Sequence, residues 1–139
     1  MRESIRLDIS AANRDLANGE WKGATVLAGS AVEALLLWAL QQRPAADITR
    51  AREAVTRDER LSRNPGDDLE RWVLLDYVEV AGELSILKPE SVQQARLAKN
   101  FRNLIHPGRV IRLGQKCDRG TALSALAAVE LVVRDLTPP

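Results

Sequence analysis

The stretch Gly23-Ala-Thr-Val-Leu-Ala-Gly-Ser-Ala-Val-Glu-Ala-Leu-Leu-Leu-Trp-Ala-Leu40 is the longest apolar segment of the chain and carries a single charge, Glu33. As a helix it is apolar on nearly all sides, which is typical of a helix buried at the centre of a bundle. Its length approaches that of a membrane span, but the charge at its middle and the amphipathic segments around it favour a core helix. We therefore expect residues 20–42 to form the central helix.

Apolar residues recur at helical spacing on both sides of this stretch, and turn residues separate the segments. Asn18-Gly19 and Asn64-Pro65-Gly66 are typical breaks, Asp47 and Asp67 or Asp68 are candidate helix caps, and Pro89 suits a first helical turn. No segment has a convincing strand pattern. The further predicted helices cover about residues 3–17, 47–57, 68–87, 89–106 and 118–136.

The composition is that of one folded domain. A length of 139 residues, with 45% hydrophobic and 28% charged residues, supports a single core spanning residues 1–139. The sequence thus predicts an all-α, single-domain helical bundle of about five to six helices. Met1 is followed by charged residues rather than by an apolar run, so we expect no secretory signal and a cytoplasmic protein.

The residue types that hold common cofactors are scarce. A single cysteine, Cys117, excludes an intramolecular disulfide, and with a single histidine it argues against a zinc site. The chain has no phosphate-binding glycine loop and no dinucleotide-binding fingerprint. We therefore expect neither a metal nor a cofactor.

The segment Phe101-Arg-Asn-Leu-Ile-His-Pro-Gly-Arg109 holds the side chains best suited to chemistry. Arg102 and His106 are four positions apart, so a helix would place them on one face, with Asn103 beside them. A guanidinium that grips a phosphate and an imidazole that moves protons are what metal-independent RNA cleavage requires, with the 2′-hydroxyl as nucleophile. The structural alternative is a salt bridge for Arg102 and a helix C-terminal cap for His106.

Positive charge gathers around this motif. Residues 96–119 contain seven basic residues and one acidic residue, which gives +6, whereas the rest of the chain carries 13 basic and 18 acidic residues, which gives −5. Such a segregated distribution is typical of a phosphate-contacting face, although a charged loop is also compatible with simple solvation. The candidate RNA-binding residues around the motif are Lys99, Arg109, Arg112 and Lys116.

Glu33 needs a partner because a lone carboxylate in an apolar helix is costly to bury as an ion. An Arg102 or His106 side chain from a facing helix would serve, either to fix the packing or to orient the imidazole for proton transfer. Glu130 falls on the apolar side of the last predicted helix and competes for the same partner.

The apolar stretch 23–37 and the segment Phe101–Arg109 together resemble the HEPN superfamily (higher eukaryotes and prokaryotes nucleotide-binding domain), in particular its small bacterial members. The resemblance implies a helical bundle that forms homodimers, in which Arg-x4–6-His motifs of two subunits meet and cleave RNA without a metal. By this resemblance Arg102 holds phosphate, Asn103 is the polar residue after it, His106 transfers the proton and Glu33 is a nearby acid. Here three residues separate Arg102 from His106, so the motif is shortened.

Two functional hypotheses follow. The first is an RNA-binding or RNA-cleaving homodimer of the toxin or defence type, with a cognate antitoxin as a further partner. The second is a non-catalytic dimerisation or partner-binding module, in which the Arg and His side chains form a structural polar network.

Overall fold

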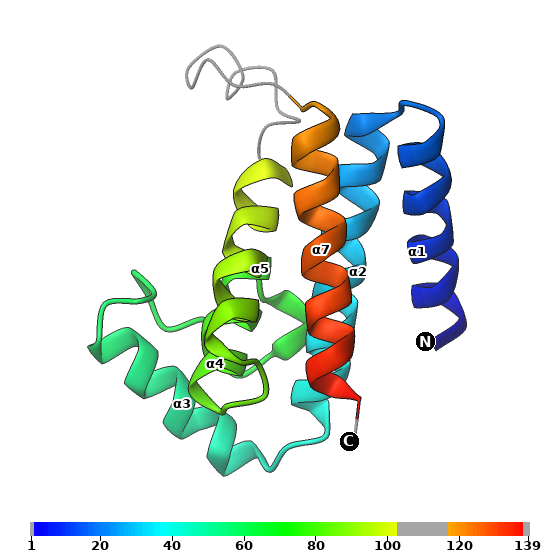
Figure 1. Ribbon diagram of the computed structural model, residues 1–139. Coiled ribbons are helices and arrows are strands. Elements are labelled where there is room, and N and C mark those ends of the chain that lie inside the picture. The colour runs from blue at the N-terminus through cyan, green and yellow to red at the C-terminus, as the bar shows by residue number, and fades with distance from the viewer. Residues whose placement is uncertain (1, 103–116, 138–139) are drawn as a thin grey trace.

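A computed structural model describes residues 2–102 and 117–137 of the chain (Figure 1). These residues form α-helices and one short 3-10 helix and contain no strand, so the predicted all-α fold is confirmed. The elements are α1 (Arg2–Ala17), α2 (Trp21–Gln41), α3 (Ala45–Arg57), η1 (Leu69–Arg71), α4 (Leu74–Glu83), α5 (Pro89–Arg102) and α7 (Arg119–Leu136).

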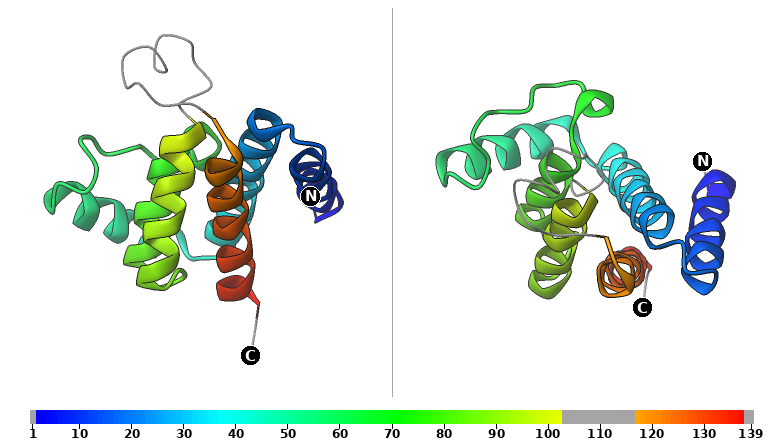
Figure 2. Two further views of the ribbon diagram at one scale, coloured as in Figure 1. Left: turned by 45° about the horizontal axis from the view of Figure 1, so that its top comes forward. Right: turned by 90° about the horizontal axis from the view of Figure 1, so that it is seen from above.

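Helix α2 is the centre of the bundle. It packs most extensively against α1 and α7 and also contacts α4 and α5, as the view along the bundle in Figure 2 shows. Its small residues Ala24, Ala28 and Ala31 and the larger Val32 and Leu36 are fully buried. Among the described residues α2 is also the one helix long and apolar enough to cross a membrane. The apolar residues of α2 are equally explained by the bundle, because α2 packs against four other helices there.

Helices α5 and α7 lie side by side and run in opposite directions (Figure 1). The Gln94 side-chain amide donates to the backbone carbonyl of Ser124 at 2.8 Å and to its hydroxyl at 2.7 Å. Closer to the start of α5, Arg134 donates to the carboxylate of Glu90 at 3.0 Å and to the hydroxyl of Ser91 at 3.2 Å. Polar contacts at two levels of α7 therefore fix the register of the two helices.

The carboxylate of Asp135 is sealed into this contact, with 1% of its side chain exposed. Burial alone would raise the pKa of Asp135, but hydrogen bonds from Ser91, from the backbone N–H of Lys88 and from Arg134 hold it below its usual value. The ionised carboxylate thus ties the start of α5 to the end of α7.

The prediction of a single long helix over residues 68–87 is wrong. The structure divides this segment into η1 and α4, with Trp72 and Val73 extended between them. The indole N–H of Trp72 donates to the carbonyl of Gly66 at 3.1 Å, and Asp76 accepts the backbone N–H of Val73 at 3.0 Å. Asp76 therefore caps a new helix where the helical spacing alone predicted a continuous one.

Two helices end on residues with left-handed backbone conformations although neither residue is glycine. Glu59 follows α3 and Ser85 follows α4, each with φ of 59°. After α3 the N–H of Glu59 bonds to the carbonyl of Thr56, and the N–H of Arg60 bonds to that of Val55. This pattern is the Schellman ending, which glycine ordinarily occupies because a Cβ is strained there.

Replacing Glu59 by glycine should stabilise the protein. The Glu59 side chain is exposed, so Glu59→Gly removes the left-handed strain without losing buried contacts, and we expect a gain of about 0.5–1 kcal/mol. The control Glu59→Ala removes the same side chain but keeps the strain. Urea unfolding should give a higher midpoint for the glycine variant than for the alanine variant. Equal midpoints would contradict strain at this position.

Candidate functional site

Three segments of the chain meet at the end of the bundle where α5 stops. The thiol of Cys117 lies 4.0 Å from the backbone carbonyl of Phe101 in the last turn of α5, and it interacts with Lys22 and Thr25 in the first turns of α2. Asp118 then caps α7 by accepting the N–H of Thr121 at 2.9 Å. The C-terminus of α5 and the N-termini of α2 and α7 therefore lie together, and the predicted Arg-His motif begins there.

Arg102 is the last residue of α5, and Lys99 lies half-buried one turn before it on the same helix. The chain thus carries the first residue of the motif to the end of the bundle by a regular helix. The other predicted site residues of this segment lie outside the described residues: Asn103, His106, Arg109, Arg112 and Lys116.

Glu33 occupies a different level of the bundle from the end of α5. It lies eight residues beyond Thr25 along α2, which corresponds to about 12 Å along the helix axis. Its charge acts instead on Tyr77 of α4, because burial and, after it, the carboxylate of Glu33 raise the pKa of Tyr77 to about 12. The Tyr77 hydroxyl donates to the carbonyl of Leu69. The backbone of Glu33 and that of Arg102 are therefore not brought together.

Glu130 was expected on the apolar side of the last helix, but it is exposed on α7. The helical spacing placed it between Leu126 and Val133, and Val133 is itself 39% exposed. This part of α7 faces outward, so Glu130 does not need the buried partner for which it was expected to compete.

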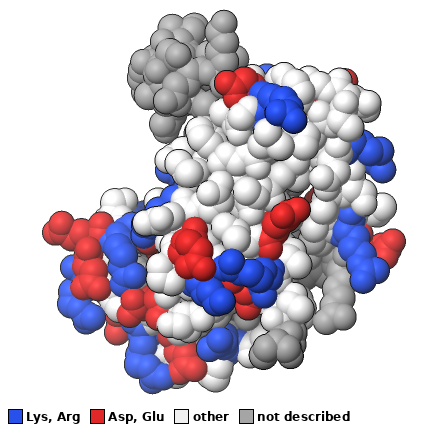
Figure 3. All heavy atoms as spheres, viewed as in Figure 1, with Lys and Arg blue, Asp and Glu red and all other residues white. Residues whose placement is uncertain are grey.

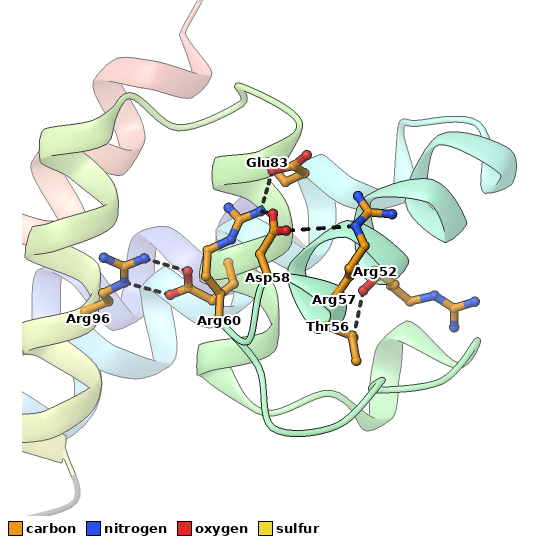
Figure 4. A network of polar contacts seen from close by, with 8 residues as sticks. Arg52, Thr56, Arg57, Asp58, Arg60, Glu83 and Arg96 are labelled. Carbon is orange, nitrogen blue, oxygen red and sulfur yellow. Dashed lines mark hydrogen bonds and ion pairs between the residues drawn. The ribbon is translucent and has the colours of Figure 1, made fainter.

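Arg96, the first residue of the basic segment, serves a structural role. Its guanidinium makes a two-pronged contact with Glu79 of α4, with Nε 2.7 Å from Oε2 and Nη2 2.6 Å from Oε1 (Figure 4). The hydrogen bond to Glu79 raises the pKa of Arg96, and the Glu79 side chain is 2% exposed. One of the seven positive charges of the segment therefore compensates a buried carboxylate.

Sequence reasoning missed Glu79 although a usable signal was present. Glu79 stands between Val78 and Val80 in an apolar helix, as Glu33 does in α2. A lone carboxylate among apolar residues needs a cation, and the partner of Glu79 is Arg96.

Cys117 is half-buried, and burial raises the pKa of its thiol. A raised pKa lowers the thiolate fraction near neutral pH, so the position is poorly suited to a nucleophile.

Comparisons with protein-family models, with curated proteins and with solved structures give no match for this chain.

Removing Arg96 should destabilise the fold more than removing another cation of the same segment. Arg96→Ala leaves the Glu79 carboxylate buried without its two-pronged partner, and we expect a loss of about 2 kcal/mol in the free energy of unfolding. Arg119→Ala removes an exposed cation and should change it by less than about 0.5 kcal/mol. Thermal or urea unfolding at pH 7 measures both. Equal small effects would show that the Glu79–Arg96 pair carries no net stability.

Proposed function

We propose that this chain is an HEPN-like RNA-binding protein that cleaves RNA without a metal at the end of the bundle where α5 stops. The observation that carries the proposal is that basic residues of three helices lie in the turns that meet at this end: Lys22 of α2, Lys99 of α5 and Arg119 of α7, with Arg102 following Lys99 along α5. A phosphate backbone is attracted to such a cluster independently of base sequence. The nearby carboxylate of Asp118 is occupied in capping α7.

The chemistry assigned to this end follows from the residue types. The Arg102 guanidinium holds a phosphodiester, and the His106 imidazole accepts the proton of the adjacent 2′-hydroxyl. The 2′-oxygen forms a bond to phosphorus while the bond to the 5′-oxygen breaks, and that oxygen leaves with a proton. The products are a 2′,3′-cyclic phosphate and a 5′-hydroxyl, so no oxidant or metal is consumed.

A second candidate function, protein-partner binding or dimerisation, is favoured by the neutral surface over α5 and α7. Leu97 is 42% exposed and Leu123 is 39% exposed. Leu97 lies one turn beyond Gln94, and Leu123 precedes Ser124, so both border the Gln94–Ser124 contact. Figure 3 shows few charged side chains over the upper parts of α5 and α7, whereas charges crowd the region around α3. Exposed apolar side chains on a neutral surface are typical of an interface, and we propose a second copy of the chain as its occupant.

RNA cleavage provides the test of the first candidate. With a labelled single-stranded RNA in EDTA, His106→Ala should lower the cleavage rate by about 10²–10⁴-fold while retaining RNA binding. Arg102→Ala should weaken binding and reduce its salt dependence. The control Arg14→Ala removes an exposed cation of α1 and should change neither. Equal cleavage by all four proteins would attribute the activity to a contaminant, and absence of RNA binding at low salt would refute the proposal.

Dimerisation provides the test of the second candidate. Leu97→Glu places a charge on the neutral surface and should convert a dimer into a monomer in sedimentation equilibrium. The matched control is Leu7→Glu, because Leu7 is 59% exposed on α1, on the other side of α7 from α5 (Figure 2). A dimer that survives Leu97→Glu but not Leu7→Glu would show that the interface includes α1 and not the surface over α5 and α7.

A further inference from the structure

A hollow of about 410 Å³ opens between α4 and α5, beside the turn that follows α3. Its volume lies within the range of about 300–1,000 Å³ found for small-molecule sites. Leu87 and Val92 form part of its apolar lining, and Ser85 and Gln93 contribute a hydroxyl and an amide. The hollow therefore combines an apolar surface with polar groups that can orient a ligand.

The charged side chains of the lining favour an anion. Arg60, Lys88 and Arg96 contribute three cationic donors to the lining, and Glu79 contributes one carboxylate. Arg96 is paired with the buried Glu79, and Arg60 is paired with Glu83 and Asp58 from outside the lining, so Lys88 carries the positive charge that these carboxylates do not offset. Lys88 immediately precedes α5, where the positive end of the helix dipole adds to its field.

The two arginines are held in place before any ligand arrives. Arg96 is fixed by its two bonds to Glu79, and Arg60 donates to Glu83 at 2.6 Å and to Asp58 at 3.2 Å (Figure 4). Among the described residues, the Nη1 group of neither arginine makes a hydrogen bond. The side chains remain 31% exposed for Arg60 and 43% exposed for Arg96. Oriented guanidinium donors therefore remain available, and their ordering costs little on binding.

We propose that this hollow binds a small phosphate monoester whose organic group is apolar. A phosphate monoester has three terminal oxygens that can accept bonds from the three donor side chains Arg60, Lys88 and Arg96, whereas a carboxylate has two oxygens. Arginines bind phosphate oxygens in two-pronged geometry, and Leu87 and Val92 contact the organic group. The site is separate from the RNA-cleaving end, because Pro89 and Arg102 lie about 20 Å apart along α5.

Calorimetry and amide NMR shifts with phenyl phosphate, inorganic phosphate and benzoate test the proposal. We expect phenyl phosphate to bind more tightly than inorganic phosphate because of its apolar ring, and benzoate to bind about tenfold more weakly than phenyl phosphate. Shifts should centre on Gly82, Ser85 and Gln93. Absence of saturable phenyl phosphate binding up to about 10 mM would overturn the proposal, and equal binding of benzoate would overturn the assignment to phosphate.

Two variants at exposed positions localise the binding without removing a buried pair. Lys88→Gln and Gln93→Glu each reduce the positive charge of the lining by one and should weaken phenyl phosphate binding about tenfold. The controls Arg14→Gln and Gln42→Glu make the same charge changes at exposed positions outside the lining and should leave binding unchanged. Equal effects of both sets would reveal non-specific attraction and refute the site. Because Arg102 and His106 are unaltered in all variants, this result is independent of RNA cleavage.

Discussion

The enclosure of α2 is the constraint on which the bundle depends. A helix that is apolar on nearly all sides is stable in water only when other helices cover it. Helices α1 and α7 provide most of the cover, and α4 and α5 contact it as well. The small residues Ala24, Ala28 and Ala31 are fully buried, so neighbouring backbones approach closely at these positions. The positions of α5 and α7, which bear the candidate sites, follow from this requirement.

The sequence predicted this arrangement well where hydrophobic spacing and breakers agree. Asn18-Gly19 ends α1, Pro89 begins α5, and α7 starts next to Asp118 as expected. The prediction of one helix over residues 68–87 was wrong because its breaks carry no glycine or proline. Asp76 caps α4 through a local hydrogen bond, and Ser85 ends α4 in a conformation usually reserved for glycine. Such breaks depend on individual bonds that periodicity does not encode.

The candidate sites were predictable to different extents. The sequence predicted a helix that includes Arg102, and Arg102 lies in α5. It counted Arg96 among the cations of a phosphate-binding segment, yet Arg96 compensates a buried Glu79, a pairing between residues 17 positions apart that local composition does not reveal. The lining of the hollow was not predictable either, because Arg60, Lys88 and Arg96 are brought together only by the turns that follow α3 and α4.

The two polar contacts between α5 and α7 differ in their response to acid. Between Gln94 and Ser124 the bonds join neutral groups, whereas near the C-terminal end of α7 the buried Asp135 accepts bonds as an anion. Its pKa is lowered in the folded protein, so its stabilisation is complete above about pH 4, the pKa range of an unfolded aspartate. That stabilisation disappears as the pH falls through the folded value. Acid therefore loosens α7 at its C-terminal end and leaves the Gln94–Ser124 contact in place.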